Sequence, residues 1–171
     1  MPARSRAAPP PIAADTNLFS VLLRYYCLES ETASDPERER QLQKISGRPE
    51  PTPLEDFDAL WQIFVRAPRR IVTQHVVAEA FSNRMRKRFN WTSAIRLLPV
   101  FSVEERGCCI SDVLAHREFQ AILEDLGPTD AGLIYTAEIE KATIISEDGR
   151  LRHWADVREV PALALNQLQY L

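Results

Sequence analysis

The chain has 171 residues, of which 45% are hydrophobic, and this is enough to build the core of one α/β domain. Its formal charge of −3 excludes a uniformly basic protein that coats nucleic acid, but it leaves room for a local basic patch beside an acidic site. The three cysteines lack Cys-x-x-Cys spacing, and no apolar stretch has the length of a signal peptide or a membrane span. We therefore expect a cytoplasmic, soluble protein with no membrane partner.

The first half of the chain reads as two strand-and-helix units separated by a polar segment. Residues 1–11 are expected to form a flexible tail ahead of a single domain at 12–171. A short apolar strand is predicted at 12–14, and helical spacing of apolar residues continues from Leu18 to Cys27. The polar, proline-containing residues 29–53 are predicted to be an exposed insertion or long loop with one helical piece near 37–45. The elements expected after it are a helix at 54–66, a strand at 70–73 and a helix from about 74 to 89.

The second half predicts more helix and two further strands. Residues 92–126 are expected to be mostly helical, with breaks near Pro99 and Gly107. Thr129 is predicted to cap a helix that reaches Ala142, and the elements expected after it are a buried strand at 143–146, a short turn or helix at 149–155 and a last strand within 160–165. Short apolar strands that alternate with longer helices indicate a three-layer α/β/α fold with a central, mainly parallel sheet. Such sheets bind ligands at the carboxyl ends of their strands.

Four acidic residues stand at segment boundaries and form the candidate site: Asp15, Glu79, Asp130 and Asp148. Carboxylates that converge from distant segments make an oxygen-rich site for Mg²⁺ or Mn²⁺, the usual apparatus for cutting phosphodiesters. Three nearby residues are candidates for supporting roles. Asn17 could cap the first helix or steady a metal-bound water, Thr129 precedes Asp130, and Ser146 could donate a hydrogen bond beside Asp148.

Each acid also has a purely structural explanation, which the sequence leaves open. Asp15 could be strand-exit and capping chemistry, and Asp130 could simply favour the positive end of a helix. Asp148 before a glycine could mark a tight turn, with Glu147 taking its metal-binding role instead. Glu79 is harder to dismiss, because its apolar neighbours mean that the carboxylate needs a partner.

A basic run follows Glu79 on the same predicted helix and is the candidate RNA-binding surface: Arg84, Arg86, Lys87 and Arg88. Further cations are expected close to the acids, from Arg69 and Arg70 before one strand and from Arg150 and Arg152 after Asp148. Phe89 and Trp91 could stack on unpaired bases, which would favour single-stranded RNA. The alternative for the basic run is an ordinary solvated helix end.

The order and context of the acids resemble those of the PIN-domain ribonucleases. The segments that carry the resemblance are strand-Asp-Thr-Asn, a glutamate in an apolar helix, Leu-Gly-Pro-Thr-Asp-Ala-Gly-Leu-Ile and Thr-Ile-Ile-Ser-Glu-Asp-Gly-Arg-Leu. They extend from about Ile12 to Leu168. The insertion at 29–53 and the proline-rich tail depart from the family pattern.

The resemblance implies a PIN-like fold and a Mg²⁺- or Mn²⁺-dependent endoribonuclease that hydrolyses single-stranded or structured RNA. It assigns both the metal-binding and the catalytic roles to the same four acids: Asp15, Glu79, Asp130 and Asp148. Compact bacterial PIN proteins are often VapC-type toxins held inactive by an antitoxin, and many are homodimers. The resemblance therefore adds an antitoxin protein and a second copy of the chain as candidate partners.

Two other readings remain open at this point. The chain could be a PIN-like protein-binding module with an inactive acidic pocket, although the presence of all four acids argues against it. It could also be a phosphatase with an aspartyl nucleophile after the first strand. Such phosphatases usually have Asp-x-Asp and a downstream lysine, whereas Thr16 and Asn17 follow Asp15 here, and Lys141 does not clearly fill the lysine role.

Overall fold

A computed structural model describes residues 10–30, 33–46, 51–82 and 94–170. The predicted tail lies almost wholly outside these ranges. So do the six residues proposed to contact RNA through charge or stacking: Arg84, Arg86, Lys87, Arg88, Phe89 and Trp91.

The centre of the fold is a five-stranded, all-parallel sheet in the order β3-β2-β1-β4-β5. Its strands are β1 (Ile12–Ala14), β2 (Arg70–Thr73), β3 (Val103–Arg106), β4 (Thr143–Ile145) and β5 (Ala162–Leu163). The central strand β1 pairs on both sides, so that Ala13 lies opposite Ile71 and Ile144. All strands run the same way, and their carboxyl ends therefore meet at one edge of the sheet.

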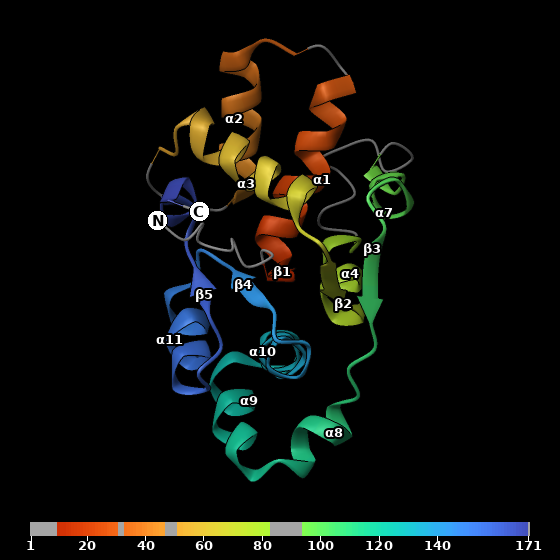
Figure 1. Ribbon diagram of the computed structural model, residues 1–171, viewed down its shortest axis with the longest axis vertical. Coiled ribbons are helices and arrows are strands. Elements are labelled where there is room, and N and C mark those ends of the chain that lie inside the picture. Colours follow the sequence, from red (N-terminus) through yellow and green to blue (C-terminus); the bar gives the residue numbers. More distant parts are fainter. Residues whose placement is uncertain (1–9, 31–32, 47–50, 83–93, 171) are drawn as a thin grey trace, which may run out of the picture.

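Helices cover both faces of this sheet, as Figure 1 shows, and the predicted parallel α/β/α fold class is confirmed. One apolar core joins Ile12, Ala14, Val72 and Ile145 to the first group of helices, and the other joins Ala13, Ile71 and Ile144 to the second. The first group is α1 (Thr16–Ser30), α2 (Asp35–Ser46), α3 (Leu54–Arg66), α4 (Gln74–Ala80) and α7 (Leu97–Val100). The second is α8 (Ile110–Ala115), α9 (Gln120–Leu126), α10 (Pro128–Glu140) and α11 (Gly149–Val157). Two 3₁₀ turns, η1 (Arg117–Phe119) and η2 (Leu165–Tyr170), complete the described elements. In the described ranges no helix is long and apolar enough to span a bilayer.

The strand β3 corrects the prediction that residues 92–126 are mostly helical. Its sequence, Val-Glu-Glu-Arg, carries three charges in four residues and has none of the apolar pattern by which a buried strand is recognised. Charged side chains are typical of edge strands, because they discourage pairing with another chain. Here the charges also serve the fold, since Glu104 and Arg106 form ion pairs with residues of neighbouring elements.

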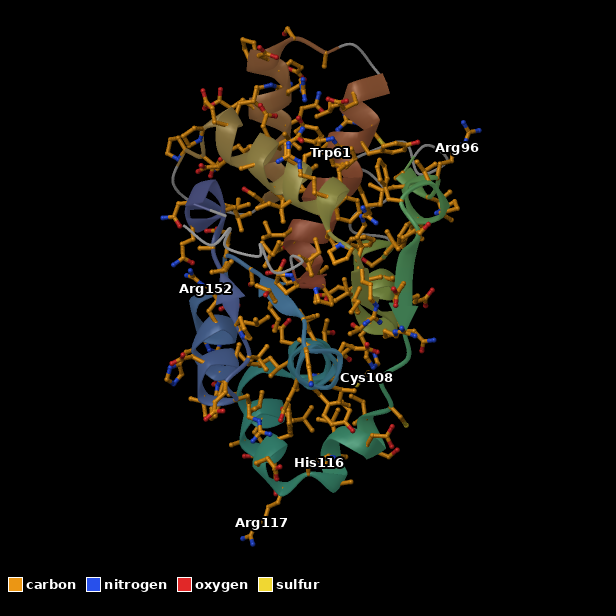
Figure 2. All side chains as sticks on the ribbon, in the orientation of Figure 1. Trp61, Arg96, Cys108, His116, Arg117 and Arg152 are labelled. Atoms are coloured by element: carbon orange, nitrogen blue, oxygen red, sulfur yellow. The ribbon has the colours of Figure 1, made fainter. Side chains whose placement is uncertain are left out.

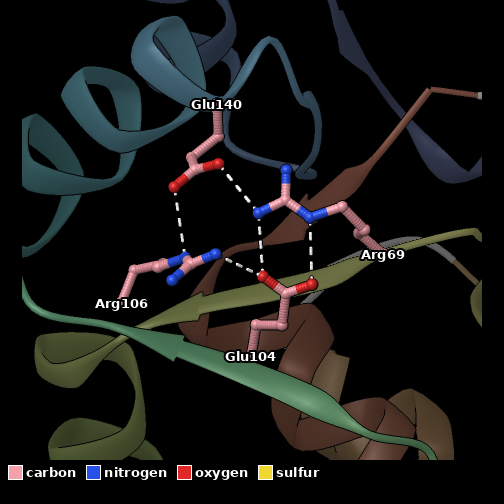
Figure 3. Close-up of polar contacts among 4 residues, drawn as sticks. All are labelled: Arg69, Glu104, Arg106 and Glu140. Atoms are coloured by element: carbon pink, nitrogen blue, oxygen red, sulfur yellow. Dashed lines mark hydrogen bonds and ion pairs between the residues drawn. The ribbon is translucent and has the colours of Figure 1, made fainter.

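Figure 3 shows this network of two arginines and two glutamates. Arg69 Nη2 lies 2.8 Å from a carboxylate oxygen of Glu104 and 2.8 Å from one of Glu140, at the end of α10. Arg106 Nε lies 3.1 Å from the other oxygen of Glu140. The quartet therefore ties the edge strand to β2 and α10.

The quartet overturns the expectation that Arg69 and Arg70 lie close to the acidic site. Both residues lie at the amino end of β2. Ligand-binding loops of a parallel sheet follow the carboxyl ends of the strands, at the opposite edge. Arg69 is neutralised by two glutamates, and Arg70 donates to the backbone oxygens of Phe64 and Phe101. Neither cation faces the acids.

A second correction concerns the start of α10. Gly127, with φ 83°, is the N-cap, and Pro128 occupies the first turn, so Thr129 lies inside the helix instead of capping it. Glycine tolerates this left-handed φ, and proline suits the first helical position because its missing N–H has no partner there. The helix ends at Glu140, before Lys141 in the left-handed conformation.

The polar segment at 29–53 contains the predicted helix, α2, but that helix is not simply exposed. Leu42 and Ile45 are buried in the core beneath α1 and α3, and Arg24 of α1 donates a 2.9 Å hydrogen bond to Gln41. Trp61 of α3, labelled in Figure 2, stacks on Tyr25 and belongs to the same core. Trp61 is therefore a packing residue and not a platform for bases.

We predict that Leu42→Ala lowers the free energy of unfolding by about 3 kcal/mol, because it leaves a cavity under a fully buried leucine. Urea unfolding of the two proteins measures this difference. The matched control is Leu114→Ala, at a leucine that is 53% exposed, which should change stability by less than about 0.5 kcal/mol. Equal effects of the two substitutions would mean that α2 does not pack on the core.

Candidate functional site

The structure brings the four predicted acids to one cavity of about 200 Å³ at the carboxyl edge of the sheet. Asp15 directly follows β1, and Asp148 lies in the turn between the neighbouring strand β4 and α11. Asp130 stands in the first turn of α10, and Glu79 stands near the end of α4. The remaining lining residues are Thr16, Asn17, Leu126, Pro128, Thr129 and Leu151.

Asp15 is the innermost acid, with only 4% of its surface exposed. Its Oδ1 accepts a 2.7 Å hydrogen bond from the backbone N–H of Leu18, which is the geometry of a helix N-cap. Its Oδ2 accepts a hydrogen bond from the hydroxyl of Ser146. The hydroxyl oxygen of Ser146 in turn accepts the N–H of Asp148 at 3.0 Å, so Ser146 links the two strand-end acids.

Glu79 lines the cavity from α4 and is exposed, in contrast to the apolar surroundings expected from its neighbours in the sequence. The hydroxyl of Thr16 donates a 2.8 Å hydrogen bond to Glu79 Oε2. Val76 and Ala80 on the same short helix are buried, whereas Glu79 is exposed. The apolar face of α4 therefore packs on the core and leaves Glu79 at the cavity, next to the residue that follows Asp15.

Asp148 has a structural role as well as a place in the cavity. Its Oδ1 accepts the backbone N–H groups of Arg150 at 2.7 Å and of Leu151 at 3.3 Å, which caps α11. Glu147 was the alternative to Asp148, but one of its carboxylate oxygens accepts the N–H of Leu165 at 2.6 Å, and Glu147 does not line the cavity. Of the two residues, Asp148 is therefore the better candidate for binding a metal ion.

Asp130 differs from the other three acids in its lack of polar partners among the described residues. No hydrogen bond or ion pair joins its carboxylate to any residue in the described ranges. Burial, followed by the charges of Asp15, Asp148 and Glu79, raises the pKa of Asp130 to about 7. Burial is also the main cause that raises the pKa of Asp15 to about 6, against the opposing hydrogen bonds from Leu18 and Ser146. The cavity thus contains like charges that disfavour one another.

This donor set suits a hard divalent cation, because among the described residues every charged group lining the cavity is a carboxylate, with no lysine, arginine or histidine. Across the described ranges, no group of three or more His, Cys, Asp or Glu side chains is arranged as a ready metal site. The acids therefore share the cavity without meeting at one point. Side-chain rotation would be needed to bring them onto one ion.

The predicted supporting residues take different places. Asn17 and Thr129 line the cavity with the acids. Ser146 lies behind it, fully buried, and positions Asp15. Two further residues were not predicted from the sequence: Thr16, whose hydroxyl donates a hydrogen bond to Glu79, and Asp125, which binds Arg150. Thr16 could have been suspected from its place beside Asp15, but nothing in the sequence indicates that Asp125 and Arg150 meet.

Comparison with protein-family models and with curated protein sequences finds no match to this chain. The likeness to PIN-domain ribonucleases therefore rests on the order of the acids along the chain.

We predict that the metal-free protein becomes less stable as the pH rises from about 4 to 7, from the unfolded pKa of the two aspartates to the folded pKa values of Asp15 and Asp130. A carboxyl with a higher pKa in the folded state binds its proton more tightly there, so the bound proton stabilises the fold. This stabilisation is complete at a pH below the unfolded pKa, and it is lost as the pH rises to the folded pKa. For Asp15 the rise in pKa from 3.8 to about 6 corresponds to about 3 kcal/mol. Urea unfolding in the presence of a chelator measures the trend, and stability that rises over this pH range would contradict it.

We further predict that Asp130→Asn stabilises the metal-free protein at pH 8, because it removes one of the repelling charges without removing a hydrogen bond to a described residue. Mg²⁺ or Mn²⁺ should raise the melting temperature of the parent protein and have a much smaller effect on Asp130→Asn. Calorimetry with and without chelator tests both statements. The matched control is Asp112→Asn, which removes an exposed aspartate from α8 outside the cavity.

Proposed function

We propose that this protein is a metal-dependent endoribonuclease with a PIN-like site, which hydrolyses phosphodiester bonds of single-stranded or structured RNA in the cytoplasm. The observation that carries the proposal is the meeting of Asp15, Glu79, Asp130 and Asp148 in one cavity, although they come from four separate segments. A purely structural explanation accounts for each acid singly. It does not account for four carboxylates that line one cavity, where burial and nearby like charges raise the pKa values of Asp15 and Asp130.

The chain would hold Mg²⁺ or Mn²⁺ through these four carboxylates. When bound, such an ion acts as a Lewis acid on the scissile phosphate and lowers the pKa of a water molecule. Asp15 can take part while keeping its hydrogen bonds from Leu18 and Ser146, because a carboxylate has about four lone-pair sites. Asp130 is the acid most available to bind an ion, since it has no competing hydrogen bond from a described residue.

The neighbouring residues would position these carboxylates and shape their environment. Ser146 and Thr16 hold Asp15 and Glu79 in place, which reduces the ordering needed when a cation binds. Leu126 and Leu151 add apolar walls to the cavity. Burial of Asp15 and Asp130 from water strengthens the attraction between these carboxylates and a cation. Binding of the cation would release a proton from Asp130 below about pH 7.

The toxin reading adds partners to the same proposal. If the chain acts as a VapC-type toxin, a protein antitoxin holds it inactive, and the active form is a homodimer. The basic residues that follow α4 are the proposed RNA contacts in this reading. A short open reading frame beside the gene, with a product that binds this protein and blocks cleavage, would support it.

The geometry argues against an aspartyl phosphatase. Asp15 would be the nucleophile, but it is buried, and each of its oxygens accepts a hydrogen bond. Lys141, the candidate lysine, follows the last residue of α10, whereas Asp130 is at the first turn of that helix. Lys141 therefore lies about a helix length from the cavity.

We predict that the purified protein cleaves a mixed-sequence single-stranded RNA with Mn²⁺ or Mg²⁺ and not with a chelator. Asp130→Asn should lower the rate at least about a hundredfold, since it removes a charged ligand worth several kcal/mol in the transition state. Gel analysis of end-labelled RNA measures both effects. Parallel incubation with a chromogenic phosphate monoester serves as the control, and turnover there without RNA cleavage would favour the phosphatase.

Metal-independent cleavage, or equal cleavage by the parent and Asp130→Asn, would refute the proposed site. No cleavage by a protein that still shows the metal-dependent rise in melting temperature would favour a binding module with an intact cation site. Absence of both effects would mean that the acids do not bind metal at all.

A further inference from the structure

Arg150 is fixed beside the carboxylate cavity by its contacts with Asp125. Its Nη2 donates to the backbone oxygen and to the carboxylate Oδ1 of Asp125, at the end of α9. The other carboxylate oxygen of Asp125 accepts a 2.8 Å hydrogen bond from the indole Nε1 of Trp154. Trp154 lies about one turn after Arg150 on α11, so the three residues join α9 to α11.

These contacts orient the guanidinium without using all of it. Across the described ranges, Nε and Nη1 of Arg150 make no hydrogen bond, and 63% of the side chain is exposed. A guanidinium offers five N–H donors in a planar fork that matches the geometry of phosphate. Arg150 can therefore bind a phosphate while Asp125 still holds it.

Residues close to Arg150 in the sequence line the cavity, which places Arg150 next to the acids. Asp148 and Leu151 on either side of it line the cavity, and so does Leu126, which follows Asp125. The charge of Arg150 acts on both Asp130 and Asp148. A polyanion that approaches four carboxylates is repelled, so a fixed cation next to the cavity provides an attraction that the cavity lacks.

Other well-placed arginines are already engaged. Arg69 and Arg106 share Glu104 and Glu140 in the quartet of Figure 3, and Arg158 forms a two-pronged pair with Glu138. Arg152, labelled in Figure 2, forms no ion pair with a residue in the described ranges, and its buried Nε has no hydrogen-bond partner there, so no such contact orients its guanidinium. Arg150 combines a fixed orientation, unengaged donors and a place beside the acids.

We propose that Arg150, oriented by Asp125 and Trp154, binds an RNA phosphate that flanks the bond to be cut. The inference rests on the proposed nuclease function and specifies how the same site holds its substrate. A flanking phosphate keeps the same charge in the ground state and in the transition state. Arg150 therefore lowers KM and has little effect on kcat.

The test compares steady-state cleavage of a short single-stranded RNA, with Mn²⁺, by the parent and four variants. Arg150→Ala should raise KM about tenfold, the loss expected for one exposed charge-assisted contact, and leave kcat within about twofold. Arg150→Lys should recover part of the loss, because it keeps the charge without the fork. Asp125→Ala should give an intermediate KM, since Arg150 remains but is no longer oriented. Arg152→Ala removes the same charge from the same helix and should leave KM unchanged.

A binding measurement gives a readout besides cleavage. Anisotropy of a labelled RNA with Ca²⁺ in place of Mn²⁺ should show weaker binding by Arg150→Ala. The slope of log K against log salt should fall by about 0.7, as for one lost contact to a single strand. Equal weakening by Arg150→Ala and Arg152→Ala would overturn the inference, and so would a fall in kcat at constant KM. A parent protein that neither binds nor cleaves RNA would overturn the proposed function itself, which is a distinguishable result.

Discussion

Asp15 is the constraint on which both the fold and the candidate site depend. It is buried at the end of the central strand. One carboxylate oxygen caps α1 by accepting the N–H of Leu18, and the other accepts a hydrogen bond from the hydroxyl of Ser146, which follows β4. The same carboxyl therefore connects the first strand, the first helix and the neighbouring strand end. Because Ser146 also accepts the N–H of Asp148, the position of a second acid follows from that of the first. The structural and the chemical explanations of Asp15 are two aspects of one set of contacts.

The grouping of the carboxylates around the cavity lowers the stability of the folded, metal-free protein. Burial and like charges raise the pKa of Asp130 to about 7, although the chain has arginines enough to neutralise every acid of the site. A fold selected only for stability would place a basic residue among these carboxylates. Unneutralised carboxylates around one cavity are instead typical of a site that receives its positive charge from outside.

The sequence predicted the elements that carry strong local patterns. The apolar strands at Ile12–Ala14 and Thr143–Ile145 and the helix at Leu54–Arg66 were confirmed, and with them the parallel α/β architecture. The charged strand Val103–Arg106 was missed because its contacts are with residues distant in sequence, through backbone pairing with β2 and ion pairs with Arg69 and Glu140. The meeting of the acids could be expected, since all of them stand at ends of elements that a parallel sheet brings to one edge. Their partners Thr16 and Asp125 could not, because side-chain contacts depend on packing angles that no local pattern contains.

The distribution of charge over the two edges of the sheet bears on the proposal that an acidic chain binds a polyanion. At the amino end of β2, Arg69 and Arg70 are occupied by glutamates and by backbone oxygens. At the carboxyl edge, no basic residue of the described ranges forms an ion pair with the acids of the cavity, and Arg150 is bound to Asp125 in a way that leaves part of its guanidinium without a hydrogen bond to a described residue. Arg69 is thus neutralised at the amino edge, whereas the acids have no described cationic partner at the carboxyl edge, where we propose that a cation and a phosphate bind. The net charge of −3 therefore does not argue against RNA, because the local arrangement of charge, and not its sum, decides what can approach the cavity.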